Sequence, residues 1–399
     1  MTAIQYLEQK QREQYGSTLR DPQEEQLKKH IQLIQHLDDP KYPMSDKEKE
    51  ENIKEFIEDM NSCPSKYQNV LEYRIMRDLF FSLKEVIDSG MVTSADGLKI
   101  EWKDLPVFGT LKMNDFSAYI TLVNNVSDPL IVFSDTVLNF ASLISKAISL
   151  SFPVKKEKNG GVSYSTDIKK IKQLLETQKE GIARFVDLMT AYSMYGRSKM
   201  AEAYYIDRKY IPLVDTFCIA FETFIIAHEY SHFVHEDLGS PTLDMDELNT
   251  TEAEDELVSR YSQELNADVL GATLTLAKMN MAGYDKTLSA SGVYLCLRSL
   301  ELINRVKNIL RGRDEDYYYS DTHPWPDFRI KMFLDKVVGN DIACLDYFKT
   351  IDFLIDIYWQ EFRKTFDSLL KLFDKIDKNF QTIDYGMVSK LIYRAYSIK

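Results

Sequence analysis

The amino-acid sequence predicts an α+β fold in which α-helices predominate. Apolar residues recur every three or four positions through both ends of the chain, which is the spacing of amphipathic helices. Two short segments, 115–125 and 128–134, are β-branched and aromatic and predict the strands of a small sheet. The length of 399 residues exceeds one minimal core, so we expect a main domain with helical additions, or two domains.

The hydrophobic pattern divides the chain into three regions. Residues 1–95 predict a helical N-terminal region, and residues 96–338 predict the main domain, with a helical insertion at about 151–210. Residues 339–399 predict a C-terminal helical region with an aromatic stripe between 353 and 373. We expect this stripe to pack in the core, and a partner-binding helix is the alternative.

Three segments of the main domain need separate treatment. Residues 153–167 contain lysines and a Gly pair and predict a loop, and residues 244–256 predict a long acidic loop that would favour basic substrates. Residues 211–227 are the most apolar stretch, but they include Asp215 and Glu222. A membrane span resists such carboxylates, so we expect a core helix and no stable membrane insertion.

Composition excludes several classes of function. The net charge of −13 is unsuited to general nucleic-acid binding, which needs clustered Lys and Arg, and it disfavours an anionic membrane surface. The four cysteines are scattered without a C-x-x-C pair, which fits a reducing compartment better than a disulfide framework or a thiolate zinc site. The polar N-terminal segment has no secretory pattern, so we expect a cytoplasmic location.

One short motif predicts chemistry. His228 and His232 are four residues apart, which places both imidazoles on the same face of a helix, and Glu229 lies between them in the sequence. Two imidazoles in this arrangement bind one Zn²⁺, and the glutamate is positioned to take a proton from a water molecule. The alternative is a helix with exposed histidines and a salt-bridging glutamate.

A catalytic zinc site needs a third protein ligand and an open position. His235 is one candidate, but three ligands on one straight helix do not converge easily on a tetrahedral ion. We favour Glu264 in the segment ELNAD on the next predicted helix. Asp268, one turn later on the same face, is placed to accept the ring N–H of a ligand histidine.

These motifs together resemble a known family. The pattern H-E-x-x-H, then E-x-x-A-D-x-x-G ending at Gly271, then His323–Pro324 with Arg329 six residues after the histidine, resembles the gluzincin metallopeptidases of the HtpX and CAAX-prenyl-protease type. The resemblance covers about residues 98–333. It implies a zincin-like domain within 96–338, although the insertion at 151–210 has no counterpart in the family pattern.

The resemblance also implies the role of each matched residue. His228, His232 and Glu264 would bind the zinc ion, Glu229 would be the general base, and Asp268 would orient a ligand. By the same resemblance, His323 and Arg329 would line the cleft and stabilise the oxyanion. Many members of the family are embedded in membranes, so we carry over the chemistry and not a membrane-linked substrate.

The predicted function is therefore a soluble zinc-dependent endopeptidase that hydrolyses an intracellular protein or peptide. Two alternatives remain. One is a regulated bacterial protease with a single protein target, of the Lit-type phage-exclusion kind, which suits a zincin core within a helical scaffold. The other is a non-catalytic helical interaction protein with a structural zinc. The open fourth position and the intact Glu229 argue against this second alternative.

Overall fold

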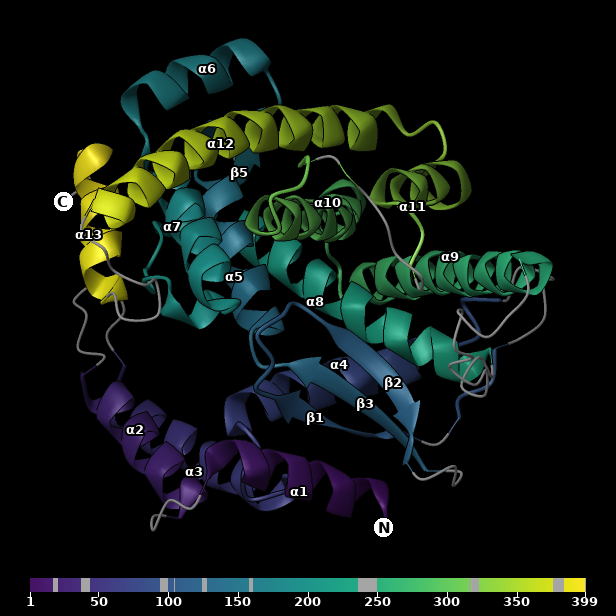
Figure 1. Ribbon diagram of the computed structural model, residues 1–399. Helices are drawn as coiled ribbons and strands as arrows, with labels where there is room; N and C mark the ends of the chain where they lie inside the picture. Colours follow the sequence, from purple (N-terminus) through teal and green to yellow (C-terminus); the bar gives the residue numbers. More distant parts are fainter. Residues whose placement is uncertain are drawn as a thin grey trace.

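The computed structural model confirms a predominantly helical α+β fold with a small sheet (Figure 1). It describes residues 1–16, 21–36, 44–93, 100–103, 105–123, 128–157, 161–235, 250–315, 317, 323–375 and 384–398. The first half contains α1 (Ala3–Tyr15), α2 (Pro22–His36), α3 (Asp46–Ser62), α4 (Val70–Asp88), β1 (Val107–Leu111), β2 (Ala118–Leu122), β3 (Pro129–Ser134), α5 (Val137–Ser149), β4 (Val154–Lys156), β5 (Val162–Tyr164), α6 (Ile168–Thr177) and α7 (Glu180–Tyr195). The second half contains α8 (Ile211–Val234), α9 (Thr250–Met281), α10 (Lys286–Leu310), α11 (Pro326–Phe333), α12 (Ile342–Lys375) and α13 (Tyr385–Ala395).

Several local expectations need correction. The strand β1 was not predicted, although Val107–Leu111 pairs along its whole length with β3. The segment expected to be a loop at 153–167 contains the two short antiparallel strands β4 and β5. The expected acidic loop is partly helical, because α9 begins at Thr250, and its residues 244–249 lie outside the described part of the chain.

The three-stranded sheet has the order β1–β3–β2, with β1 parallel and β2 antiparallel to the central strand. Side chains of β3 alternate between two faces, as in any strand. Ile131 and Phe133 belong to the large core that contains α4 and α8, whereas Leu130 and Val132 pack in a small cluster with Leu7 of α1. Figure 1 shows α1 below the sheet and α8 above it.

Glutamine side chains occupy the outer edge of β1. The carboxamide of Gln14 accepts from the backbone N–H of Lys112 at 2.7 Å and donates to its carbonyl at 3.0 Å. Gln68 accepts from the N–H of Thr110 at 3.0 Å, and Gln11 donates to the Thr110 carbonyl at 2.9 Å. Side-chain amides therefore replace the hydrogen bonds that a fourth strand would make there.

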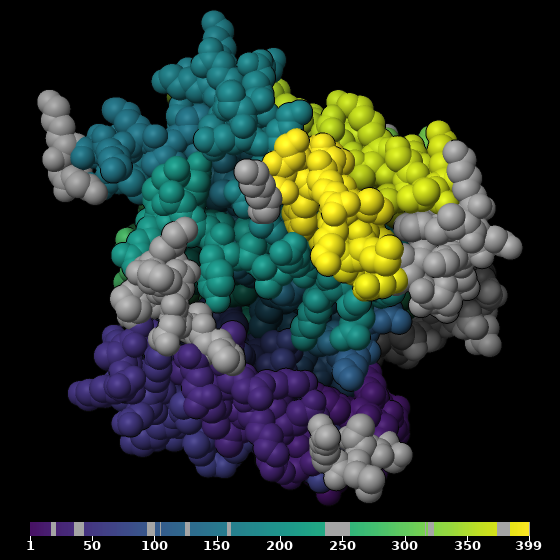
Figure 2. Space-filling view, turned by 90° about the vertical axis from the view of Figure 1, so that its left-hand side faces the viewer, coloured from purple at the N-terminus to yellow at the C-terminus, as the bar shows by residue number. Residues whose placement is uncertain are grey.

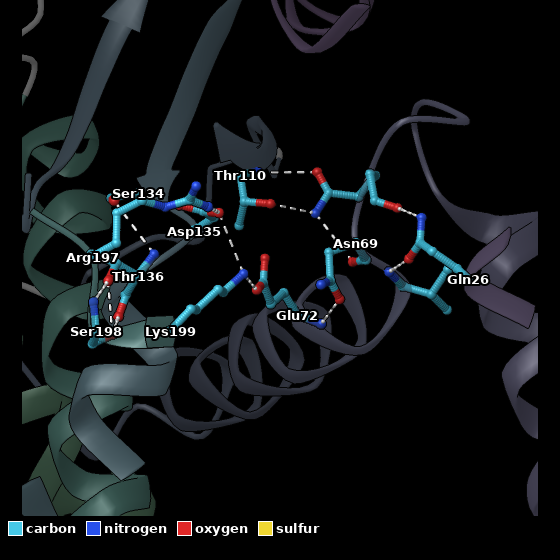
Figure 3. A network of polar contacts seen from close by, with 12 residues as sticks. Gln26, Asn69, Glu72, Thr110, Ser134, Asp135, Thr136, Arg197, Ser198 and Lys199 are labelled. Atoms are coloured by element: carbon cyan, nitrogen blue, oxygen red, sulfur yellow. Dashed lines mark hydrogen bonds and ion pairs between the residues drawn. The ribbon is translucent and has the colours of Figure 1, made fainter. Parts of the chain in front are cut away.

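A polar network attaches the N-terminal helices to the rest of the molecule (Figure 3). Lys199 lies between two buried carboxylates, 2.5 Å from Glu72 of α4 and 3.5 Å from Asp135 after β3. Arg197 pairs with the same Asp135 at 2.6 Å. These contacts join α4, the end of β3 and the segment that follows α7, which are distant in the sequence.

The C-terminal helix α13 is also attached by buried polar contacts. Tyr385 and Tyr393 donate hydrogen bonds to the carboxylate of Asp187 on α7, at 2.7 and 2.8 Å, and Asp187 is only 1% exposed. Figure 2 shows α13 as the yellow surface that covers the teal helices on this side, with the purple N-terminal helices below. In the predicted aromatic stripe of α12, Tyr358, Trp359, Phe362 and Phe366 are buried as expected, whereas Phe353 is partly buried.

Helix α8 is the centre of the hydrophobic core, which extends in sequence from Met76 to Ile392 and therefore includes residues of all three regions. Among the described residues, the segment 208–234 is the one helix long and apolar enough to cross a membrane, yet 72% of its apolar window is buried by the protein. This burial is what the core-helix interpretation of residues 211–227 predicts.

Two glycines let neighbouring helices approach α8 closely. A Cβ atom at Gly271 of α9 would lie 2.9 Å from the backbone nitrogen of His228, and one at Gly292 of α10 would lie 2.7 Å from the carbonyl oxygen of Phe217. Contacts this short with backbone require the helices to separate. Glycine is therefore required where α9 and α10 cross α8.

We predict that Gly271→Ala destabilises the protein, although glycine-to-alanine usually stabilises a helix by about 1 kcal/mol. The added methyl group meets the α8 backbone, so we expect a net loss of about 1–3 kcal/mol in the free energy of unfolding, measured by urea titration. Thr273→Ala on the same helix is the control and should change stability by less than about 1 kcal/mol. An equally stable Gly271→Ala would show that the two helices are not in forced contact.

Candidate metal and catalytic site

Helix α8 holds the first half of the site. Its buried residues continue as far as Ser231, and among them His228 and Glu229 are 6% and 7% exposed. The Nε2 atoms of His228 and His232 face each other at 3.3 Å. His235 caps the helix and is exposed, and it does not belong to the cluster formed by these two imidazoles.

Helix α9 supplies the second half. The close approach at Gly271 places Glu264, two turns earlier, opposite the two imidazoles. Its carboxylate oxygens lie 3.4 Å from His228 Nε2 and 3.5 Å from His232 Nε2. One potential ligand atom from each of His228, His232 and Glu264 falls within 4.8 Å of the others. The structure thus brings together the three residues that the sequence analysis selected as metal ligands.

Asp268 orients this group from behind. Its Oδ1 lies 3.0 Å from Nδ1 of His228, so Nε2 of the same ring is directed at Glu264. Arg329 of α11 donates two hydrogen bonds to Asp268, from Nε at 2.7 Å and from Nη2 at 2.6 Å. Asp268 is 2% exposed and Arg329 7% exposed, so this is a buried, two-pronged ion pair.

The two residues expected to stabilise an oxyanion differ in position. His323 precedes α11, its side chain is half exposed, and its Nε2 lies 3.6 Å from Glu264 Oε2. Arg329 lines the same cleft, but its Nε and Nη2 both bind Asp268. Arg329 therefore contacts Asp268, and Asp268 in turn contacts the candidate ligand His228.

The site opens into a cleft of about 340 Å³. His228, Glu229, His323 and Arg329 lie in its wall, together with Ser117 and Ala118 at the start of β2. Helix α10 forms another wall, which the sequence analysis missed. Leu300, Ile303 and Lys307 were visible as one face of an amphipathic helix, but no motif distinguished this face from an ordinary core face. The tyrosine-rich segment 317–320 precedes His323 in the sequence, and of this segment only Tyr317 lies within the described residues, where it is exposed.

Burial and neighbouring charges shift the pKa values of Glu229 and Glu264 in opposite directions. Burial raises the pKa of Glu229, which the neighbouring imidazoles of His228 and His232 only partly offset. Burial also acts to raise the pKa of Glu264, but the imidazoles of His228 and His232, which lie 3.4 and 3.5 Å from its carboxylate oxygens, outweigh it and hold that pKa well below its usual value. Glu229 is therefore the better proton acceptor of the two at neutral pH, and Glu264 is the better anionic ligand.

The residues present fit a divalent cation. Glu264 Oε2 is buried without a hydrogen-bond partner, although the imidazole nitrogens of His228 and His323 lie within 3.6 Å of it. Leaving a buried carboxylate oxygen unpaired is costly. Two nitrogen ligands and one carboxylate are a donor set that Zn²⁺ accepts, and other divalent ions accept it too.

Comparisons with known proteins assign no family to this chain: no protein family, no curated protein and no solved structure matches it.

We predict that the Asp268–Arg329 pair is essential for stability. Arg329→Met leaves the Asp268 carboxylate buried without its counter-charge, which costs about 3–5 kcal/mol in the free energy of unfolding. The double variant Arg329→Met/Asp268→Asn removes both charges and should be more stable than Arg329→Met alone. Lys286→Met, which breaks the exposed pair with Asp341, is the control and should cost less than about 1 kcal/mol. Equal losses in Arg329→Met and Lys286→Met would contradict the prediction.

Proposed function

We propose that the protein is a metal-dependent endopeptidase with one Zn²⁺ held by His228, His232 and Glu264. The observation that carries this proposal is the convergence of these three side chains, within 4.8 Å of one another, beside a cleft whose wall contains His228 and Glu229. The ordered motifs that resemble the gluzincin metallopeptidases support the same assignment. Three protein ligands leave one coordination position open, as catalytic sites do and structural sites rarely do.

A zinc ion in such a site supplies Lewis acidity, which polarises a carbonyl and lowers the pKa of water to about 7. Glu229, buried beside the ligands and with a raised pKa, accepts the proton of the attacking water and then delivers it to the leaving amine. His323 lines the cleft with its Nε2 3.6 Å from Glu264 Oε2. Its half-exposed ring can donate a hydrogen bond to the carbonyl oxygen of the substrate. Asp268 and Arg329 hold the ring of His228 in a fixed orientation.

The sheet suggests how a peptide enters. Within the described residues β2 pairs only with β3, so its outer edge has no strand partner, and its first residue Ala118 lies in the wall of the cleft. An extended substrate that adds to this edge would be directed past Glu229. The substrate we propose is therefore an extended segment of a protein or peptide.

All four cysteines are free thiols, which supports the proposed cytoplasmic location.

Metal content tests the ligand set. We expect wild-type protein, purified with zinc and without chelators, to contain about one zinc ion per chain by elemental mass spectrometry. Glu264→Ala should lose most of this zinc, because it removes the only carboxylate among the three ligands. His235→Ala, at the end of α8 but outside the cluster, should keep it. Zinc-free wild type, or equal zinc in Glu264→Ala, would rule out the proposed site.

The role of Glu229 is tested separately from metal binding. We expect the zinc-loaded wild type to hydrolyse a proteome-derived peptide mixture, with new termini read by mass spectrometry, and Glu229→Gln to keep its zinc but lose about 100-fold or more in rate. Glu222→Gln is the matched control, because Glu222 lies two turns earlier on α8 and is equally buried, at 7% exposed, but does not line the cleft. Full zinc without any hydrolysis would favour the non-catalytic alternative.

A further inference from the structure

The cleft is a groove that follows one face of α10. Its wall here consists of Cys296, Leu300, Ile303, Asn304 and Lys307 of α10 and of Arg311, which caps the helix. Apart from the adjacent Ile303 and Asn304, these residues are three or four positions apart. With a rise of about 1.5 Å per residue, the groove extends about 22 Å along the helix. The Cys296 end is the end next to the candidate metal site, because Arg329, which binds Asp268, is near the Cys296 thiol. Burial raises the pKa of this thiol, and the charge of Arg329 opposes the rise.

The middle of the groove is apolar. Phe224 and Ile225 of α8 line it together with Leu300 and Ile303 of α10, and Phe116 contributes from the turn before β2. None of these five side chains offers a hydrogen bond. This part of the groove therefore favours apolar side chains of a bound peptide and excludes charged ones.

The far end of the groove is cationic. Lys307 and Arg311 are four residues apart, so their side chains lie on the same face of the helix. Asp115 pairs with Lys307 at 2.8 Å and also accepts a hydrogen bond from Tyr192. Arg311 is exposed, and the ion pairs found among the described residues do not include it. Two cations against one carboxylate leave an excess positive charge at this end.

The placement of these cations goes beyond what the helix itself requires. A lysine and an arginine in the last turn are favourable to the helix dipole wherever they point. Like charges four residues apart repel, however, and these two are placed together on the wall of the cleft. In a chain of net charge −13, a cationic end to the candidate substrate groove favours an anionic group on the ligand.

We infer that the groove selects peptides with a carboxylate, which Lys307 and Arg311 bind, beyond an apolar stretch. This inference rests on the proposed peptidase function. Lys307 is 11 residues from Cys296, about 16 Å along the helix, and an extended peptide advances about 3.3 Å per residue. The carboxylate therefore lies about five residues from the scissile bond. This preference is opposite to the basic preference that the acidic segment 244–256 suggested.

The test measures binding and cleavage independently. Zinc-loaded Glu229→Gln protein is titrated with fluorescein-labelled peptides that carry one Glu, or Gln in its place, at successive positions along an apolar and serine background. We expect the Glu peptide to bind about five- to tenfold more tightly at one position, by fluorescence anisotropy. Lys307→Glu/Arg311→Glu should abolish or reverse this difference, and the conservative pair Lys307→Arg/Arg311→Lys should restore it. Arg313→Glu, which is exposed and outside the groove wall, should leave the preference unchanged.

The source of the carboxylate is distinguished by the peptide terminus. If amidating the C-terminus removes the preference while the internal Glu has no effect, the groove binds a terminal carboxylate. If the internal Glu alone matters, it binds an acidic side chain. Either result supports the inference.

Cleavage of the peptide mixture by the wild type separates this inference from the proposed function. An acidic preference in binding, without hydrolysis, would reject the peptidase and keep the groove. Glu229-dependent hydrolysis with no acidic enrichment, or with an enrichment that survives the double charge reversal, would reject the groove and keep the peptidase. Equal binding of the Glu and Gln peptides at every position would also overturn the inference.

Discussion

The close contact between α8 and α9 is the constraint on which the candidate site depends. The histidines are on one helix and the carboxylates on the other, and a Cβ atom at Gly271 would already collide with the backbone of His228. At that separation Glu264 reaches both imidazoles and Asp268 reaches the back of the His228 ring. Because α8 is buried on most of its surface, it has little freedom to adjust if α9 moves away.

Asp268 connects this pair of helices to a third helix, α11. It holds His228 on one side and is held by Arg329 of α11 on the other, so three helices meet at one buried carboxylate. The resemblance to the gluzincins implied that Arg329 would act on the oxyanion. In the structure its Nε and Nη2 bind Asp268, which lies beside the candidate ligand His228. A sequence motif gives the spacing of residues along the chain, but it does not specify which neighbour each side chain binds.

The parts of the fold that the sequence predicted are those that depend on local spacing. His228 and His232 share a face because of helical periodicity, and the same argument applied to Glu264 and Asp268. The strand β1 was missed because its pairing with β3 joins segments that are not adjacent in the sequence. The groove along α10 was missed for a related reason: Lys307 becomes part of it only because α10 crosses α8 at Gly292.

The glutamines on β1 also determine how this sheet can associate with other chains. Growth of a fibre by edge-to-edge strand pairing needs two available edges on every copy, one to join and one to be joined. The carboxamides of Gln11, Gln14 and Gln68 already satisfy the β1 edge at Thr110 and Lys112. A copy that pairs through β2 therefore has no second edge to offer to a further copy. Association through this sheet stops at a single partner instead of continuing into a polymer.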